Sequence, residues 1–390
     1  MITEISLLFT IFRVGVTADL LDEFRLTDSY KTYFDVTSRL FNDKFVNGGY
    51  RKEISPIFTI KALNVTDPVP RFPVQITFIY FRLVQLDAQA QLMTALVEFS
   101  YKWPDLRLQW NPAEYSGLDT IWLKYDTVWF PENVISDTQE FIIINPEVQR
   151  TVRLSSNGTV AYYFSGNTRA SCQMNVRVFP FDTQKCEIGF SVETYGSDFV
   201  TATGETASHL DDSIYDGNGE WEVLDIKPSK KIYSSYNAKE QEYEYIKFTL
   251  HLKRRPHFYI YVIVLPCFML TLLSIVGMFW NAHIKEEKLT KLSIGLTSMM
   301  SMTLLLDMMA QEIPKNATFP LLGFYVIISI GIIALGCAVV VIVSSPQPRS
   351  REKFWSEKVR RYLCSRTFVL QFFFQLMNII NFIVLFSFWR

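Results

Sequence analysis

The stretch that decides the fold is CQMNVRVFPFDTQKC, residues 172–186. Its two cysteines, Cys172 and Cys186, enclose thirteen residues whose centre reads Phe-Pro-Phe-Asp. Pro180 fixes a rigid turn, the flanking phenylalanines supply apolar surface, and Asp182 places a charge beside them. In a chain that also carries four long apolar segments, this spacing predicts an extracellular disulfide loop on a membrane protein. The simpler alternative is an ordinary hairpin disulfide in a secreted domain, worth ~3 kcal/mol by loop entropy.

Length and composition favour a membrane protein. The 390 residues can form two domains or one large one, and the hydrophobic fraction of 49% exceeds what a soluble enzyme needs. The net charge of −1 carries little information, because the charges are unevenly placed. Long segments almost free of charge have the ~20 apolar residues that a spanning helix requires. They predict membrane spans at about 258–280, 291–311, 319–343 and 367–389.

Basic residues predict the orientation of these spans. Segment 344–366 holds the densest basic patch of the chain, segment 281–291 adds three lysines, and the segment after the second span has only Lys315. The positive-inside rule makes 344–366 a short cytoplasmic loop and places the N-terminal domain and the C-terminus outside the cell. We therefore expect an extracellular domain over 19–255 and a transmembrane four-helix domain over 256–390.

The N-terminus has the pattern of a signal peptide over 1–18. An apolar run at 5–16 precedes small residues and Asp19, and an uncleaved apolar strand is the alternative. Export would explain both the disulfide and the sequons at Asn64 and Asn157, which we expect to be glycosylated.

Two periodicities predict the structure of the outer domain. Residues 22–45 carry apolar side chains at close to helical spacing, whereas period-two alternation appears at 76–80, 152–154 and 248–252. Turn residues such as Asp216-Gly-Asn-Gly219 separate the alternating runs. We therefore expect an all-β, immunoglobulin-like extracellular sandwich with an N-terminal helix, followed by a four-helix transmembrane bundle.

Signatures of enzymes are missing from the sequence. No Gly-rich phosphate loop, His/Cys metal spacing or Gly-x-Ser-x-Gly elbow occurs, and the four histidines are scattered singly. We therefore expect no enzymatic activity, no cofactor, no metal site and no nucleic-acid partner. A membrane enzyme with an outer hydrolytic domain is a remote alternative, because no nucleophile–base pair stands out.

Several motifs occur together in order along the chain. They are Trp103-Pro-Asp105, Leu108-Gln-Trp110-Asn-Pro-Ala-Glu-Tyr-Ser-Gly117, Trp129-Phe-Pro131-Glu132, Gly219-Glu-Trp221 and Pro320-Leu-Leu-Gly323-Phe-Tyr325. With the 172–186 loop, they make nearly the whole mature chain similar to pentameric neurotransmitter-gated (Cys-loop) channels, and most to a divergent nicotinic acetylcholine receptor subunit. The resemblance implies a small-molecule agonist, contact with membrane lipid and four further subunits in a homo- or heteropentamer. It also implies a plasma-membrane location, with the postsynaptic membrane as one expectation.

The resemblance further implies a ligand site, which nicotinic members build as a cage of aromatic rings around a cationic nitrogen. The matching positions, with a neighbouring tyrosine, are Tyr236, Tyr243, Glu193, Tyr195, Ser136 and Glu98. Three expected rings are replaced, two of them by carboxylates, which argues against acetylcholine as a simple cage ligand. The carboxylates could pair with an amine, or could titrate if the proton is the agonist, because partly buried acids have raised pKa values. Alternatively, the subunit forms no principal binding face and both carboxylates are solvated.

The span at 291–311 resembles the second membrane helix of the family, which lines the pore. With Thr303 and Pro314 setting the register, one stripe holds Ser293, Thr297, Met300, Leu304, Asp307 and Gln311. Its hydroxyls and outer polar groups suit water and ions, and its Met and Leu belt can gate by dewetting. Met300 stands where the family generally has leucine, and its bulk preserves a gate.

The acidic side chain near the outer end of this span predicts which ions the channel conducts. An acidic residue inside a span should face water, so five copies of Asp307 would concentrate cations. The Pro-Ala-Arg triplet typical of anion-selective members is missing, and Leu289-Thr290-Lys291 stands there. We expect a cation-selective channel that converts binding of a neurotransmitter-like small ligand into ion current. The alternatives are an anion-selective channel, with Asp307 bonded to a neighbouring helix, and a non-conducting accessory subunit.

Overall fold

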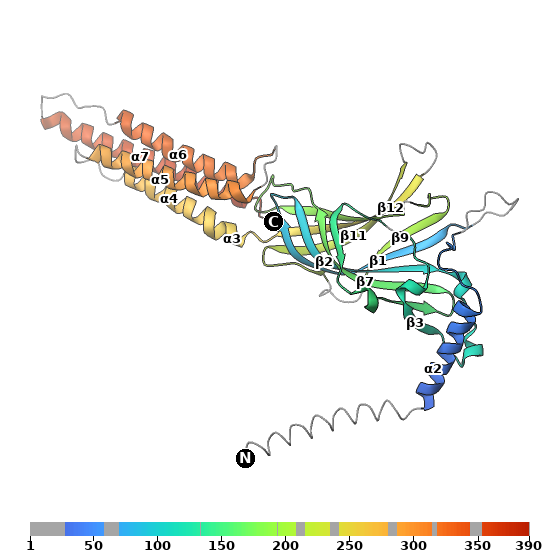
Figure 1. Ribbon diagram of the computed structural model, residues 1–390. Helices are drawn as coiled ribbons and strands as arrows, with labels where there is room; N and C mark the ends of the chain where they lie inside the picture. Colours follow the sequence, from blue (N-terminus) through green and yellow to red (C-terminus); the bar gives the residue numbers. More distant parts are fainter. Residues whose placement is uncertain are drawn as a thin grey trace, which may run out of the picture.

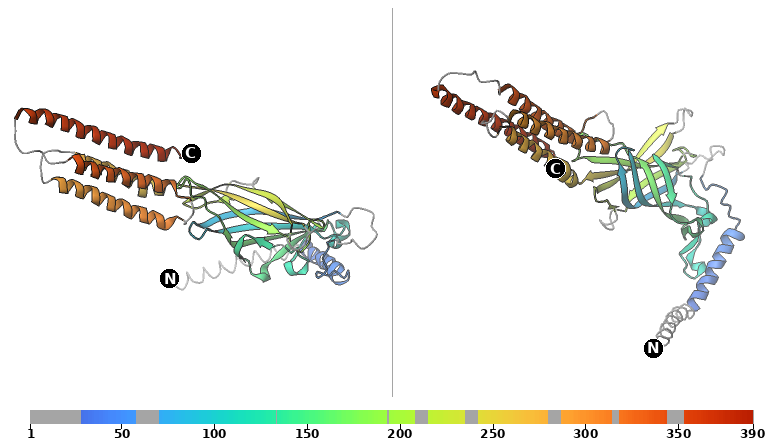
Figure 2. Two further views of the ribbon diagram at one scale, coloured as in Figure 1. Left: turned by 90° about the horizontal axis from the view of Figure 1, so that it is seen from above. Right: turned by 60° about the vertical axis from the view of Figure 1, so that its left-hand side comes forward.

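The computed structural model describes residues 28–57, 70–132, 134–192, 194–207, 215–234, 242–279, 287–313, 318–343 and 353–389. The β-strands and the long helices form two bodies that lie end to end (Figure 1), as the view from above also shows (Figure 2). The expected signal peptide lies outside the described residues, and so do Asn64, Glu193 and Tyr236.

The N-terminal helix α2, Asp28–Phe41, continues into a π-helical turn, η1, at Asn42–Val46. Its buried side includes Leu40, which belongs to the hydrophobic core. The Tyr115 hydroxyl donates to Asp43 at 3.0 Å and so fastens the turn to the β-domain. The predicted N-terminal helix is confirmed.

The larger of the two sheets has the strand order β10-β1-β2-β7-β6-β3, with β5 paired to β7 and β9 paired to β1. Its strands are β1 Phe72–Asp87, β2 Leu92–Pro104, β3 Thr120–Lys124, β5 Thr138–Ile143, β6 Thr151–Ser155, β7 Thr159–Ser171, β9 Val200–Thr206 and β10 Tyr215–Asp216. Short 3-10 helices lie between strands, at η2 Leu106–Leu108, η3 Pro112–Tyr115, η4 Tyr125–Thr127 and η5 Glu147–Gln149.

The smaller sheet has the order β11-β12-β8-β4 and is antiparallel throughout. Its strands are β4 Val134–Ser136, β8 Thr183–Ser191, β11 Trp221–Ser234 and β12 Glu242–Arg254. In β12 every second residue from Glu244 to Arg254 is buried, which is the pattern of a strand with one face on a core.

An aromatic core joins the two sheets. Phe78 and Phe99 of the larger sheet lie with ring centroids 4.6 Å apart, and Phe99 is 4.8 Å from Phe190 of the smaller sheet. Phe248 completes the cluster at 5.3 Å from Phe78. These inward residues occupy alternate positions in their strands, so the β-sandwich predicted from period-two patterning is confirmed.

The second body is built from long helices. They are α3 His257–Tyr259, η7 Ile260–Val264 and α4 Leu265–Phe279 in succession, then α5 Glu287–Glu312, α6 Leu321–Val343 and α7 Lys353–Phe386. Within the described residues, four stretches are long and apolar enough to cross a membrane, at His257–Phe279, Leu289–Glu312, Leu321–Ile342 and Phe368–Phe386. The helix α7 begins at Lys353, so part of the segment expected as a cytoplasmic loop is helical.

Local chemistry explains two details of the helices. Pro266 cannot donate a backbone hydrogen bond, and the π-helical stretch η7 ends two residues before it. The buried amide of Asn381 in α7 donates to the Tyr325 carbonyl and to the Ser329 hydroxyl of α6, each at 3.1 Å. Such side-chain bonds hold apolar helices together where the hydrophobic effect between them is weak.

Candidate ligand site, junction and pore helix

Three tyrosines lie together on the outer face of the smaller sheet. Tyr233 of β11 pairs with Tyr243 of β12, and their rings are stacked with centroids 5.7 Å apart. Tyr245, two residues further along β12, points to the same face, and its ring lies 6.5 Å from that of Tyr233. This cluster contains the expected site residue Tyr243 and two rings that the sequence reasoning missed.

Serine and aspartate from β4 and the residue after it complete this face. Ser136 lies opposite Gly189 of β8, and its hydroxyl is 3.2 Å from that of Ser191. The hydroxyl of Tyr245 crosses over Gly189 and donates to Asp137. Period-two spacing from Tyr243 could have indicated Tyr245 in advance, but nothing local indicated Asp137.

Burial changes the acidity of the tyrosine in this bond. Burial, followed by the hydrogen bond to Asp137, raises the pKa of Tyr245 above its usual value. Its hydroxyl is therefore a protonated donor at neutral pH, and the carboxylate is the acceptor.

Two described residues of the expected ligand site, Glu98 and Tyr195, lie elsewhere. Glu98 belongs to β2 of the larger sheet, between Tyr80 and Ser165, and its neighbours Val97 and Phe99 are buried in the core. It therefore faces away from the core, on the opposite side of the sandwich from the tyrosines. Burial against its neighbours raises the pKa of Glu98. A single chain does not bring Glu98 and Tyr243 together.

Tyr195 follows β8 and is half-buried. It packs against the hydrophobic core, in a turn whose next residues bond to β1 and β12. Among the described residues, the Tyr195 ring makes no ring contact with those of Tyr233, Tyr243 or Tyr245. The structure therefore groups it with the core of the sandwich.

The predicted disulfide between Cys172 and Cys186 is present, with a Cα–Cα distance of 4.7 Å. It closes the loop that ends the sandwich on the side of the helices. Asn157, the other sequon named above, is exposed in a tight turn where its side chain accepts from the Thr159 amide at 2.9 Å.

A buried arginine lies where the sandwich meets the helices. The side chain of Arg254, 3% exposed, donates to Asp182 of the disulfide loop at 2.9 and 3.3 Å and also bonds to Glu220. Its guanidinium lies 4.0 Å from the ring centroid of Trp221 and 4.8 Å from that of Phe179. Burial by itself lowers the pKa of an arginine, but Asp182 outweighs it and the pKa of Arg254 is raised. The charge is thus fully compensated.

The disulfide loop is bonded directly to the helices. The backbone amides of Leu321 and Leu322, at the start of α6, donate to the carbonyls of Arg177 and Phe179 at 3.1 and 3.2 Å. These donors have no partner within their own helix, so the loop caps α6. On its other side the loop packs Phe181 against Trp389, with centroids 5.7 Å apart.

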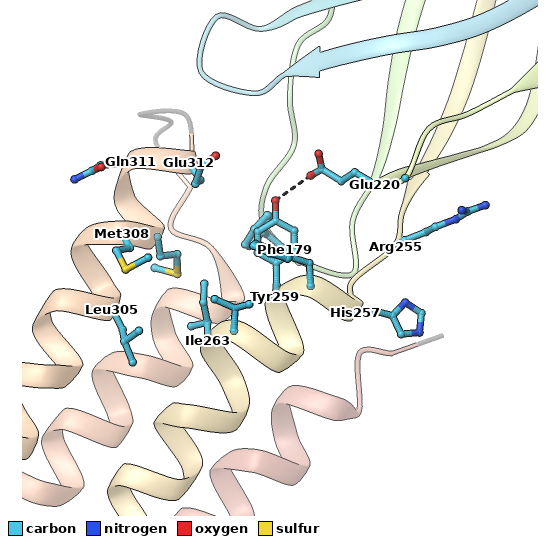
Figure 3. Close-up of a pocket in the computed structure, with 14 residues that line it drawn as sticks. Phe179, Glu220, Arg255, His257, Tyr259, Ile263, Leu305, Met308, Gln311 and Glu312 are labelled. Carbon is cyan, nitrogen blue, oxygen red and sulfur yellow. Dashed lines mark hydrogen bonds between the residues drawn. The ribbon is translucent and has the colours of Figure 1, made fainter.

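A cavity of about 690 Å³ lies beside this junction, between the residues that begin at His257 and the end of α5 nearest the sandwich (Figure 3). Phe179, Tyr259 and Ile263 line one side, and Leu305 and Met308 line the other. The Tyr259 hydroxyl donates to Glu220 at 2.9 Å, as the dashed line marks. The cavity is therefore mostly apolar, with Glu220 and Arg255 from the sandwich side and Gln311 and Glu312 from the end of α5 as polar groups in its lining.

The predicted stripe of α5 is exposed in the single chain. Its six residues are exposed, including Met300 at 67% and Leu304 at 59%. The opposite side of α5 contains Met302 and Met309, which are 0% and 3% exposed. At the end of α5 nearest the sandwich, the Gln311 amide donates to the Asp307 carboxylate at 3.0 Å. Asp307 thus has a partner on its own helix, one turn away.

Metal binding has no support in the part of the chain that the structure describes. No group of three or more His, Cys, Asp or Glu side chains is arranged to hold an ion there. The cysteines Cys267 and Cys337 are free and buried among the helices.

Comparison with known proteins agrees with these features. The model of the neurotransmitter-gated ion-channel ligand binding domain matches residues 37–256, more than half of the chain, and the chain belongs to this family. It is 32% identical over 307 residues to neuronal acetylcholine receptor subunit alpha-9 of Homo sapiens, across 78% of this chain and 60% of that subunit. It is 27% identical over 332 residues to subunit beta-3 of Rattus norvegicus, across 82% of this chain and 67% of the relative.

The resemblance to nicotinic receptor subunits is thereby confirmed. The chain spans about 60% of the length of the human alpha-9 subunit that it matches.

Proposed function

We propose that this chain is one subunit of a pentameric ion channel in the plasma membrane, opened by a small extracellular ligand. The observation that carries the proposal is the bonded contact between the disulfide loop and α6. Because the Arg177 and Phe179 carbonyls hold the first amides of that helix, a shift of the sandwich must move the helix or break these bonds. The four membrane-length helices and the family membership agree with this function.

The ligand proposed for this site is a cationic amine. The faces of Tyr233, Tyr243 and Tyr245 attract cations, and Asp137 adds a negative charge beside them. Glu98 lies on the other side of the sandwich, so it would complete the site from a neighbouring subunit. The relatives are named as acetylcholine receptor subunits, which supports the same ligand class.

The proton is a second candidate ligand, and one observation favours it. Burial raises the pKa of Glu98, so its protonation lies closer to neutral pH than that of an exposed glutamate. Protonation would then change the charge at the boundary between subunits.

We further propose that α5 lines a cation-selective pore. Its exposed side carries Met300 and Leu304 in the middle, which would form a dewetting gate, and Asp307 at the outer end. A ring of five such carboxylates would raise the local cation concentration. In this arrangement the sandwich and both chain termini lie outside the cell.

Voltage-clamp recording from oocytes tests the proposal. Cells expressing the chain alone, or with a related subunit, are challenged with acetylcholine, other amines, amino acids and acidic pH. The proposal expects ligand-evoked current that reverses near the cation potential. Reversal at the chloride potential would exclude cation selectivity, and surface delivery without current under every condition would favour an accessory subunit.

A further inference from the structure

The hairpin of β11 and β12 leaves the smaller sheet at a defined residue. β12 pairs with β8 from Lys253 up to Tyr245, which lies opposite Ser191. Beyond Tyr245, residues 242–244 form strand pairs only with residues 232–234 of β11 among the described residues, and the Glu242 carbonyl also accepts a hydrogen bond from the Ser197 amide at 2.7 Å. This two-stranded segment, here called the ribbon, projects from the sandwich (Figure 1). Tyr233 and Tyr243 of the proposed ligand site belong to it.

An ionic anchor holds the inner face of the ribbon. Glu244 is 4% exposed, and its carboxylate lies 3.2 Å from Arg71 and 2.6 Å from Lys230. It also accepts a hydrogen bond from the Ala202 amide of β9 at 2.6 Å. With three partners around a buried carboxylate, breaking this anchor would leave a buried charge unpaired.

On the outer face, one residue along, a side-chain hydrogen bond holds the base of the ribbon. The Tyr245 hydroxyl donates to Asp137, whose own carbonyl accepts from the Ser171 amide at 2.9 Å. The ring reaches Asp137 by crossing β8 at Gly189, where any Cβ would overlap the tyrosine hydroxyl. Asp137 has φ of 62°, a left-handed conformation that Asp tolerates better than most residues. Gly189 and Asp137 are therefore both suited to this contact.

We propose that Glu244 and Tyr245 form a two-sided clamp that positions the ribbon, with the Tyr245–Asp137 bond as its releasable half. Adjacent strand residues point to opposite faces, so the clamp holds β12 from both sides at the point where it leaves β8. One bond on the outer face can open while the buried anchor at Glu244 stays closed. The proposal rests on the proposed function only in assigning ligand contact to the ribbon.

Hydrogen exchange of the purified full chain in detergent tests the clamp without any ligand. Tyr245→Phe removes the donor, and Asp137→Asn weakens the bond by replacing the charged acceptor with a neutral amide oxygen, while keeping a residue that tolerates a left-handed backbone. Tyr245→Phe should speed exchange at 232–234 and 242–244 by about tenfold, and Asp137→Asn by less. The double variant should exchange no faster than Tyr245→Phe, because without the hydroxyl the acceptor has nothing left to bind. Tyr163→Phe, which removes a hydroxyl from β7, is the matched control and should leave ribbon exchange unchanged.

Gly189→Ala should break the Tyr245–Asp137 bond by a second, independent route. The new methyl group must displace the tyrosine ring, so ribbon exchange should rise with the hydroxyl still present. Unchanged ribbon exchange in Tyr245→Phe and Gly189→Ala, or additive effects of Tyr245→Phe and Asp137→Asn, would overturn the clamp.

Recording with acetylcholine as the probe separates the clamp from the proposed function. If the ribbon closes over ligand, Tyr245→Phe should lower the half-maximal concentration by about threefold or more with the maximal current preserved. A wild-type chain that delivers no acetylcholine current counts against the amine ligand, and exchange alone then decides the clamp. If Tyr245→Phe instead increases the half-maximal acetylcholine concentration, release of the ribbon is not a step in gating.

Discussion

The effect of replacing a charged residue where the sandwich meets the helices should depend on how deeply that residue is buried. Arg254 is almost completely enclosed, with Asp182 and Glu220 as its acceptors and aromatic rings around it. Its neighbour Arg255 is exposed. Because removing one partner of a buried ion pair leaves the other charge buried and uncompensated, these adjacent arginines should respond very differently to the same substitution.

Arg254→Gln should therefore abolish stable folding or surface delivery. It leaves the Asp182 carboxylate buried without its cationic partner, at a cost of ~3–5 kcal/mol. Surface labelling and thermal unfolding of the solubilised chain measure the loss. Arg255→Gln is the matched control and should behave as wild type. Equal behaviour of the two variants would contradict the assignment of a compensated buried charge.

Glu98→Gln should make stability less dependent on pH. The raised pKa of Glu98 means that the folded state favours the protonated acid, so its contribution to stability is full below the unfolded pKa and is lost as pH rises through the folded pKa. Gln mimics the protonated form and should raise the free energy of unfolding at neutral pH, by less than ~1 kcal/mol because solvent screens the site. Thermal unfolding of the full chain between pH 4 and 8 tests this, with the exposed Glu222→Gln as control.

At the scale of elements, the two faces of helix α5 lie in different environments. One face packs Met302 and Met309 among the other helices, and the other face presents Met300, Leu304 and Asp307 outside the single chain. The same residue type, methionine, therefore occurs on both faces. Position alone decides which methionine serves packing and which is available to a pore.

Met300→Ser should hydrate the proposed gate and stabilise the open state. We expect spontaneous current and a lower half-maximal agonist concentration, because a hydroxyl opposes dewetting. Met302→Ser is the matched control: it buries a polar group at a packed position, so it should lower expression without producing spontaneous current. Silent Met300→Ser channels with unchanged responses would place the gate elsewhere.

Asp307→Asn should reduce cation selectivity. The substitution removes one negative charge per subunit at nearly constant shape, and the amide can still contact Gln311. We expect smaller inward cation current, with the greater loss at low ionic strength, and a reversal potential displaced toward that of chloride. Asp216→Asn, at an exposed position in the sandwich, should change none of these. An unaltered reversal potential would show that Asp307 does not set selectivity.

At the scale of the whole molecule, the disulfide loop connects the two bodies. It carries Asp182 toward the sandwich, Phe181 toward the end of α7 and the residues after it, and backbone carbonyls toward α6. A loop with contacts on several sides must keep one shape for all of them to form together. The covalent bond between Cys172 and Cys186 limits the alternatives available to it.

Cys172→Ser should therefore prevent surface assembly rather than shift agonist sensitivity. The loss of the loop constraint costs ~3 kcal/mol and leaves Cys186 as a free thiol in an oxidising compartment. Surface biotinylation and native gel electrophoresis measure assembly, with the free thiol replaced in Cys267→Ser as the control. Normal surface oligomers with wild-type gating would contradict this role for the disulfide.

The sequence by itself determined the sandwich, the N-terminal helix, the membrane-length helices and the disulfide. Each of these depends on a short-range signal, since period-two and helical spacing, charge-free runs of ~20 residues and a closely spaced cysteine pair can be read locally. Membership of the family followed from motifs in a fixed order for the same reason.

Only the tertiary structure decided which side chains meet. Tyr245 and Asp137 are 108 positions apart in the chain, and Arg254 and Asp182 are 72 apart, so no local pattern could pair them. The opposite placement of Glu98 and Tyr243 likewise depends on how two sheets stack. Strand register and sheet packing carry this information, because a strand's pattern specifies which residues face inward but not which partner each of them finds.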